Sequence, residues 1–488
     1  MSRWLEALAV IAPSAAMSRL RALSAVRAYD GATVGRRGSS FRPGQGGTAN
    51  AALAPSLPRL RERSRDLVRN TPFAARAIAV KSSHLIGTGI RVEWATGSDK
   101  LDLQIGTAFE DWAGDCDIEG RLDFAGIQGI STRSMLESGE SVIRMIDRKY
   151  KAGTVPLKLK VYEGDQIDDG KYADNVRMGV ALGDWDERLG LWMKPGETEA
   201  KRRTDSVLVP NDQLCHLFHT LRPGQVRGVP ILAPVMLTHR DIADVMEAVI
   251  MKAKIEACGG LFVERPDLGS LGLGGELAAE MGQDGKKPKF QESMAPGMIM
   301  YGLPGEKAHP IPMSSTAAVE PMSKMALRGM AVGMGITYAQ LSGDMSEANY
   351  SSLKAGAIDF HRENEVIQWQ VIAPQMMHRI VRCWINRAIL AGVLRRRAAG
   401  YRYNLVMPAR PPIDPIKEIT ADIMEVRSGR MSPQEFIAMN GRPWREVAEE
   451  FRTFYAATDD LTFDTDPRRT TKQGQAQDAT ATADPTNG

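Results

Sequence analysis

The chain has 488 residues, more than one compact core usually organises, so two or more lobes are expected. Hydrophobic residues make up 43% and charged residues 25%, which are values of a globular protein and exclude a wholly disordered or fibrous chain. The 62 basic and 59 acidic residues leave a formal net charge of +3, so the large basic excess of a protein that grips nucleic acid tightly is missing.

Both ends of the chain are expected to lie outside the folded core. Residues 1–48 are predicted to be a flexible basic arm, because the stretch from Arg36 to Ala49 is rich in Gly, Ser and Arg and lacks apolar periodicity. Residues 459–488 are of low complexity and are predicted to be disordered.

The first sixteen residues have a basic start and a short apolar run, which is also the outline of a secretory signal. Glu6 interrupts the run, and its apolar residues recur at helical spacing, so a surface or docking helix is favoured. No other apolar stretch reaches the ~18 residues of a membrane span. The cysteines, which form no CxxC pair and favour a reducing cytoplasm, are Cys116, Cys215, Cys258 and Cys383.

Residues 49–232 are predicted to form an α+β lobe. A helical pattern from Leu57 through Ile78 is broken by Asn70 and Pro72. The strand-like runs that follow are Ile90–Trp94, Ser141–Ile146 and Leu157–Tyr162, and the helices expected beside them are Leu103–Trp112 and Ile127–Glu137.

Two long helices are predicted to flank a small inserted lobe. The first runs from Pro234 to Ala257, and the second from Val319 to Met334. Between them the chain is full of Gly and Pro, with strand-like pieces at Leu261–Glu264 and Gly297–Tyr301. The apolar stripe of the first helix consists of Ile242, Val245, Met246, Val249, Ile250 and Ala253. This arrangement resembles a stalk that carries a knob.

The rest of the chain is predicted to be mainly helical. A polar loop over Leu341–Asn349 precedes a helix that begins near Tyr350 and that Pro374 kinks or divides. Asp414 and Pro415 start a further helix. Beyond it are a capping box over Ser432–Glu435 and a last helix that carries Trp444, Val447, Phe451, Phe454 and Tyr455.

No catalytic, cofactor or metal site is predicted. The segment at Gly282 lacks the glycine spacing and the hydroxyl residue of a phosphate-binding loop, and the glycine cluster near Gly272 has no βαβ unit around it. Ordinary packing is favoured over a zinc site for Cys215, His216 and His219, and a solvated turn over a divalent-ion site for Asp165, Asp168 and Asp169. The tract Arg395–Arg397 is interpreted as compensation of a helix dipole, with phosphate contact as the alternative.

Four segments, in order, resemble the lambda-type phage portal protein family, over about residues 50–455. They are Ala49–Ile78 with Ile86–Val92, Arg222–Met236, Leu341–Gly356 and Pro411–Ile423. The structural motif of the second segment consists of Arg222, Pro223, Gly224, Gln225, Arg227 and Gly228. The chain departs from the family at the helix beginning with Trp444, where an acidic residue is expected early in the helix.

The resemblance implies an α+β portal fold with wing, helical stem, small α/β clip and helical crown, in a closed, non-enzymatic ring of about twelve copies. The implied parts are the wing (residues 49–232), stem helix (233–258), clip (259–317), second stem helix (318–336), channel loop (337–353), kinked helix with return to the wing (354–410) and crown (411–458). No cofactor and no membrane contact are implied.

The resemblance also implies partners and a location. The channel would carry double-stranded DNA without sequence specificity during packaging and ejection. The clip would face the terminase large subunit and later the head-completion or adaptor proteins, while the wing and crown would meet the major capsid and scaffold proteins. The protein would lie in the virion at the capsid portal vertex, and in the host cytoplasm during assembly.

The residues expected in the channel loop are Ser342, Gly343, Asp344, Glu347, Asn349, Tyr350, Ser351 and Ser352. Gly343 would give mobility, and Asp344 and Glu347 would repel phosphate. Asn349, with the two serines after it, would pin the next helix, although this segment can also be read as a helix start alone. Two rival functions stay open: a nuclease or ATPase of the packaging module, and a monomeric head-to-tail adaptor.

Overall fold

The computed structural model describes residues 48–148, 154–196, 205–257, 261–263, 299–301, 319–346, 349–410 and 414–458. Residues 1–47 of the predicted arm, the predicted tail after 458 and most of the segment 259–317 lie outside the described residues. None of the helices in the described ranges is long and apolar enough to cross a membrane.

The chain divides into two compact units, of which the smaller covers Met1–Leu57 and Leu221–Val226. Within it, helix α3 (Ala49–Leu53) begins after Thr48, whose side chain accepts a hydrogen bond from the backbone N–H of Ala51. Asn50 holds the two segments of this unit together, because its Nδ2 donates to Gly224 O over 2.8 Å and its Oδ1 accepts from Val226 N over 3.0 Å.

The larger unit begins with two helices, α4 (Leu57–Asn70) and α5 (Pro72–Ile86), and their boundary is the one predicted from Asn70 and Pro72. Proline at the first helical position loses no hydrogen bond, so it starts α5 without a cost. Helix α5 runs eight residues further than predicted and ends at Gly87, with φ of +52°. Helices α6 (Asp99–Gly114) and α7 (Phe124–Ser138) follow, both longer than predicted.

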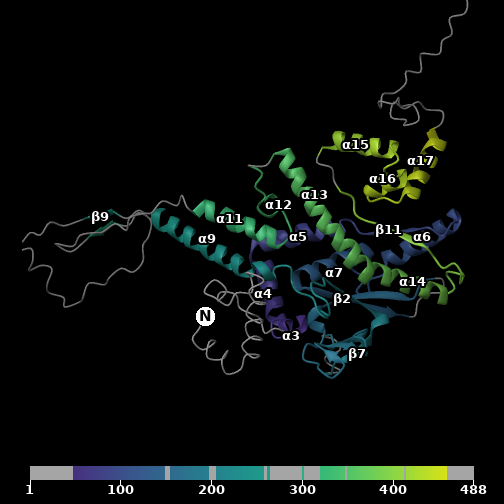
Figure 1. Cartoon of the computed structure of the whole chain (residues 1–488), viewed down its shortest axis with the longest axis horizontal. Coiled ribbons are helices and arrows are strands. Elements are labelled where there is room, and N and C mark those ends of the chain that lie inside the picture. Colours follow the sequence, from purple (N-terminus) through teal and green to yellow (C-terminus); the bar gives the residue numbers. More distant parts are fainter. Residues whose placement is uncertain are drawn as a thin grey trace, which may run out of the picture. The chain divides into compact units, whose positions relative to one another are not determined.

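Three sheets complete this region (Figure 1). The central one is antiparallel in the order β3 (Leu157–Glu163), β2 (Glu140–Asp147) and β8 (Leu214–Phe218), with α7 packed against it. A second antiparallel sheet consists of β4 (Val176–Arg177), β5 (Val180–Leu182), β6 (Arg188–Met193) and β7 (Val207–Pro210). Strand β1 (Arg91–Trp94) pairs antiparallel with β11 (Tyr403–Val406).

An aromatic cluster lies at the centre of the core. Trp384 is fully buried, and its ring lies 5.0 Å from that of Phe109 and 5.6 Å from that of Trp94. Because large aromatic side chains bury the most apolar surface, this cluster fixes the β1–β11 pair and α6 against the helix that carries Trp384 (His378–Leu390).

The two long helices are present and lie side by side: α9 (Met236–Ala257), preceded by the turn η4 (Ala233–Val235), and α11 (Val319–Gly333) (Figure 1). The described pieces between them, β9 (Leu261–Val263) and β10 (Ile299–Tyr301), form a parallel pair. Only Ile242 of the predicted apolar stripe is buried in the chain. The other residues of the stripe are partly or fully exposed in the subunit.

The polar loop before the next helix is shorter than predicted. Leu341 and Ser342 belong to a short helix, α12 (Tyr338–Ser342), because Thr337 and Gln340 form a capping box and Leu341 is buried. The loop starts at Gly343, so Ser342 is a helical residue and not a loop residue.

Pro374 does not break the helix that follows. Helix α13 (Tyr350–Ile367) continues through a π-helical segment, η7 (Gln368–Met377), into α14 (His378–Leu390). In the segment that contains Pro374, His378 N donates to the carbonyl of Ala373, five residues earlier. The wider π turn accommodates a residue that has no N–H, so the chain stays helical through Pro374.

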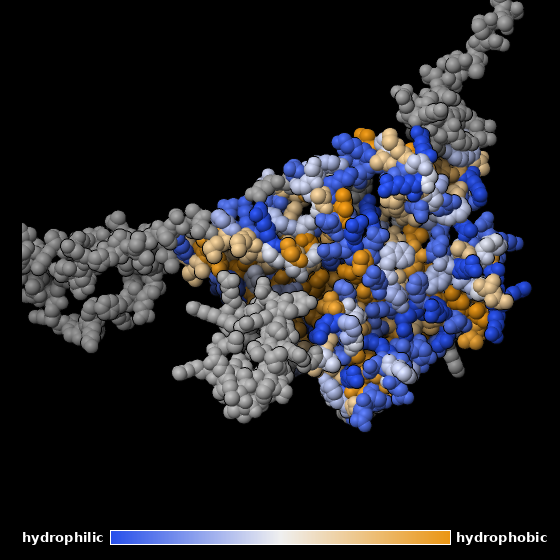
Figure 2. Space-filling model, in the orientation of Figure 1, coloured by the Kyte–Doolittle hydropathy of each residue, from blue (hydrophilic) through white to orange (hydrophobic). Residues whose placement is uncertain are grey.

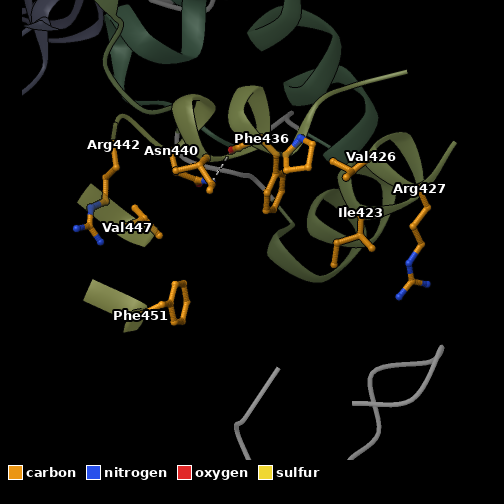
Figure 3. Close-up of a pocket in the computed structure, with 10 residues that line it drawn as sticks. Ile423, Val426, Arg427, Phe436, Asn440, Arg442, Val447 and Phe451 are labelled. Carbon is orange, nitrogen blue, oxygen red and sulfur yellow. Dashed lines mark hydrogen bonds between the residues drawn. The ribbon is translucent and has the colours of Figure 1, made fainter. Parts of the chain in front are cut away.

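The C-terminal helices are α15 (Pro415–Arg427), α16 (Pro433–Met439) and α17 (Trp444–Thr458). The predicted caps are confirmed: Asp414 accepts from Lys417 N, and Ser432 and Glu435 form a capping box. The three helices border an apolar cavity of about 530 Å³ (Figure 3), into which Phe436 and Ile423 point. No residue of these three helices is buried. The apolar side chains of Ile416, Phe451 and Phe454 are exposed.

Candidate functional site

The segment predicted to line a channel is an exposed loop between two capped helices. On its N-terminal side, the Thr337 side chain accepts from Gln340 N over 3.2 Å, and Gln340 Oε1 accepts from Thr337 N over 3.0 Å. The helix ends at Gly343, whose φ of +73° is a conformation that costs glycine little. Nothing lies within 4 Å of the position where a Cβ of Gly343 would be, so the need for glycine here is one of backbone conformation alone.

Asp344 is held in a defined conformation at the start of this loop. Its Oδ1 accepts hydrogen bonds from the backbone N–H and the hydroxyl of Ser346, over 3.0 and 2.6 Å, and its Oδ2 accepts from Tyr338 Oη over 3.3 Å. The hydrogen bonds from Ser346 lower the pKa of this partly exposed carboxyl. Asp344 therefore carries its negative charge at neutral pH. Glu347 lies outside the described residues.

The second helix, α13, is pinned at its first turn. Asn349 Oδ1 accepts from Ser352 N over 2.8 Å, and Ser352 Oγ accepts from Asn349 N over 3.1 Å, which completes a capping box. Ser351 is exposed in the same turn and takes no part in the cap. The Tyr350 ring receives the ammonium group of Lys417 from α15 at 5.3 Å.

A second candidate region surrounds Arg227, the buried arginine of the predicted structural motif. Its guanidinium group donates to both carboxylate oxygens of Glu140, at 2.6 to 3.1 Å, and to Asp169 Oδ1 at 2.5 Å. Arg227 and Glu140 are both fully buried. Burial alone would raise the pKa of Glu140, but the charge of Arg227 and the hydrogen bonds from His216 and Arg227 hold it well below its usual value.

Arg61 of α4 is the second cation of this buried ion cluster. Its Nη2 donates to Glu140 Oε1 over 2.6 Å, and its Nη1 to Asp169 Oδ2 over 3.1 Å. One helix turn further, Arg65 pairs with Asp165 and, at 3.2 Å, with Glu163. Of the three aspartates considered for a divalent ion, Asp165 and Asp169 are thus paired with arginines.

His216 connects the cluster to Arg188 of β6. Burial lowers the pKa of His216 to about 4, so the ring is neutral near pH 7. Its Nε2 lies 2.9 Å from Glu140 Oε2, and its Nδ1 lies 2.7 Å from Arg188 Nη1. Since arginine only donates, Nδ1 is the acceptor and Nε2 carries the proton that it donates to Glu140.

Glycines allow the backbone to close around Glu140. A Cβ on Gly164 would lie 2.6 Å from the Glu140 side chain, and a Cβ on Gly228 would lie 1.9 Å from the carbonyl oxygen of Gly139. Gly228 N also donates to Glu140 Oε2 over 3.3 Å. The remaining motif residues divide by exposure: Gln225 is buried, and Arg222, Pro223 and Gly224 are exposed.

The sequence drew attention to Arg227, Asp169 and His216 separately, but not to Glu140 or Arg61, which join them. One signal was available: Arg61 stands on the face of α4 that also carries Leu57, Ser64 and Val68, so a charged residue occupies a position with core-type spacing. Within the described ranges no group of three or more His, Cys, Asp or Glu residues could hold a metal ion. The cluster is a set of ion pairs that joins Arg61 of α4 to Glu140 of β2 and to the segments that carry Asp169 and Arg227.

A family model described as phage portal protein, lambda family, matches residues 34–368, more than two thirds of the chain. The chain belongs to this portal family. Similar curated proteins include the probable portal protein of Halomonas phage phiHAP-1, 22% identical over 84% of this chain and 83% of its own length. The portal protein of Escherichia phage N15 and portal protein B of Escherichia phage lambda are each 21% identical, over 82% of this chain and 84% of their own lengths.

Solved structures with weaker similarity include a chain from the neck of a native gene transfer agent particle, with a TM-score of 0.42 and 15% identity over 78% of this chain and 93% of that one. An HK97 family phage portal protein from Corynebacterium diphtheriae has a TM-score of 0.32 and 12% identity, over 77% of this chain and 99% of that one. The family assignment depends on the sequence match and not on these structural likenesses.

Membership in the portal family, together with the mixed helix and sheet architecture, confirms the expected α+β portal fold. It also makes the chain a structural, non-enzymatic protein that forms rings in a phage capsid. The nuclease and ATPase alternatives are thereby set aside.

Proposed function

We propose that about twelve copies of this chain form a closed ring at the portal vertex of a phage head, and that double-stranded DNA passes through its centre during packaging and ejection. The observation that carries this proposal is the ionised Asp344, which lies partly exposed just after Gly343, between two helices with capped ends. A loop with fixed ends and a negative charge keeps a DNA backbone centred without holding it.

The electrostatics of the whole chain favour sliding. Each neutralised phosphate strengthens DNA attachment through counterion release, and a ring multiplies every contact by the number of subunits. The formal charge of +3 per chain limits such attachment.

In this proposal each segment of the chain corresponds to one part of the portal ring. The α+β region 49–232 and the helices of 354–410 form the wing, α9 and α11 the stem, residues 259–317 the clip, residues 337–353 the channel segment and α15 to α17 the crown. The clip docks the terminase large subunit and then the head-completion or adaptor proteins. The wing and crown contact the major capsid and scaffold proteins, and the ring nucleates head assembly in the host cytoplasm.

Negative-stain images of the purified chain test the ring directly. We expect rings with a central hole, whereas compact monomers would favour a head-to-tail adaptor without a channel. The loop is tested by Asp344→Lys together with Glu347→Lys, which should slow or arrest DNA packaging while rings still form. Unchanged packaging rates in that double variant would exclude the loop from the channel lining.

A further inference from the structure

Helix α11 has apolar residues on two opposite faces, and only one of them is covered in the chain. The buried face consists of Leu327, Met330 and Ala331, followed by Met334 just after the helix. A second set is exposed and consists of Met322 at 69%, Met325 at 77% and Val332 at 80%, whose spacings of three and seven residues place them on one side of the helix. At about 100° per residue, the two sets point in opposite directions. We call the second set, together with Gly329, the outer face of α11.

Gly329 completes the outer face, between Met325 and Val332. A glycine inside a helix costs stability, so its presence needs a reason. Among the residues that the structure describes, none lies within 4 Å of the position where a Cβ of Gly329 would be, and the φ of Gly329 is not in the left-handed region. The reason is therefore not a contact within the subunit, and a helix that crosses closely from outside supplies one.

Helix α9 also has an uncovered face. Leu237 is 74% exposed and Met251 52% exposed, with the small Ala248 exposed between them. These residues are spaced so that they share one side of α9, and Asp241 and Asp244 lie on the same side. We call these five residues the back face of α9. In the described residues of α9 after Ile242, no side chain is buried.

Acidic residues of α9 and basic residues of α11 lie at similar positions along the two helix axes. A Cβ on Gly333 would lie 2.4 Å from Val235 Cγ1, so the end of α11 and the start of α9 are level. Since α9 leads away from this point and α11 returns to it, residues at equal distance along each helix are level as well. Counted from Val235 and Gly333, Asp244 is then level with Lys324, and Asp241 is one residue off the level of Arg328. In a ring closed by pure rotation, neighbouring copies keep these heights.

We propose that the outer face of α11 in one copy packs against the back face of α9 in the next copy, with the helices crossing at Gly329 and Arg328 facing Asp241. This contact rests on the proposed ring and names the surface that closes it. Patches of intermediate and high hydropathy are visible on the helix pair α9 and α11 (Figure 2), as an interface between copies requires. Methionines in both faces let the packing adapt to the curvature of the ring.

The steric part is tested with Gly329→Leu, measured by native mass spectrometry and negative-stain imaging of the full chain. We expect the subunit concentration for half assembly to rise at least tenfold, while the melting temperature of the monomer does not fall. The matched control is Gly129→Leu, because Gly129 also lies inside a helix with nothing within 4 Å of a Cβ. Normal assembly of Gly329→Leu, in a preparation where the wild type forms rings, overturns the proposed contact.

The electrostatic part distinguishes a contact between copies from one within a copy. Arg328→Asp alone and Asp241→Arg alone should each assemble at least tenfold more weakly than the wild type. An equal mixture of the two should recover rings of alternating copies, because every α11–α9 contact in such a ring joins opposite charges when the number of copies is even. Failure of the mixture to assemble overturns the pairing. A wild type that forms no ring overturns the proposed function itself, and this contact with it.

Discussion

Arg445 Nη1 donates a hydrogen bond to Asp102 Oδ2 over 2.6 Å and thereby joins α17 to α6. The other oxygen of Asp102 accepts from the backbone N–H and the hydroxyl of Thr96, over 2.9 and 2.6 Å. Arg445 also donates to the carbonyl of Trp94. Resemblance to the family led us to expect an acidic residue early in this helix. Glu446 supplies an acidic residue in the first turn and pairs with Arg91 and Arg442, while Arg445 beside it takes its acidic partner from α6.

Replacing Arg445 by Ala should lower the free energy of unfolding by about 1 to 2 kcal/mol, because Asp102 is nearly buried and would lose a charge-assisted hydrogen bond. The measurement is denaturant unfolding of the purified chain, followed by tryptophan fluorescence. The matched control is Arg452→Ala, which removes an exposed pair with Glu449 on the same helix and should cost less than about 0.5 kcal/mol. Equal losses for the two variants would contradict the anchoring role of Arg445.

The helix starts could be predicted because capping is local. Asp414 with Pro415, and Ser432 with Glu435, carry their partners within four residues, so the sequence alone determines them. The loop was predicted to begin at Leu341 but begins at Gly343. Leu341 belongs to the preceding helix because it is buried, and its burial depends on the tertiary structure. Pro374 was expected to interrupt its helix because propensity describes an α-helix, and it does not foresee a π segment.

The ion cluster and the coverage of the long helices could not be predicted, for two different reasons. Glu140 meets Arg61 and Arg227 across 79 and 87 residues of sequence, and no local pattern links positions so far apart. The stripe of α9 shows a correct helical period, but a period identifies an apolar face and not the molecule that covers it.

Replacing Glu140 by Gln should lower the free energy of unfolding by about 3 to 5 kcal/mol, since it removes the charge that two fully buried arginines share. The loss is measured by denaturant unfolding near pH 7. Asp147→Asn is the control on the same strand, because Asp147 pairs with Arg387 at the surface and should cost less than about 1 kcal/mol. A Glu140→Gln variant as stable as the wild type would show that the cluster does not hold these elements together.

Replacing Asn349 by Ala should loosen the first turn of α13 without unfolding the protein. Loss of an N-cap costs about 1 kcal/mol, which corresponds to roughly fivefold faster hydrogen exchange in the amides of that turn. Exchange mass spectrometry over residues 349–353 measures the effect. Ser351→Ala is the matched control, because Ser351 lies in the same turn but outside the cap. Unchanged exchange in Asn349→Ala would mean that the capping box does not fix the end of the loop.

Acidification should destabilise the protein through His216 before it affects Glu140. The pKa of His216 is about 4 in the folded chain, because burial opposes the charged ring, against an ordinary value of 6.5. Between these values the unfolded chain binds a proton that the folded chain does not, so the free energy of unfolding falls as the pH drops from 6.5 to 4. A difference of this size corresponds to about 3 kcal/mol at the acidic end. Glu140 adds its own loss only below its ordinary value of 4.5, because its pKa is lowered in the fold.

The variant His216→Gln separates this effect from that of other histidines, including His239, whose pKa burial also lowers to about 4. A glutamine amide can donate to Glu140 and accept from Arg188, as the neutral ring does, but it does not titrate. Unfolding curves at pH 7, 5.5 and 4 should show the wild type losing about 3 kcal/mol more than the variant over this range. Parallel losses in the two proteins would mean that His216 is already protonated in the folded chain, in which case Nδ1 could not accept from Arg188 while Nε2 would still donate to Glu140.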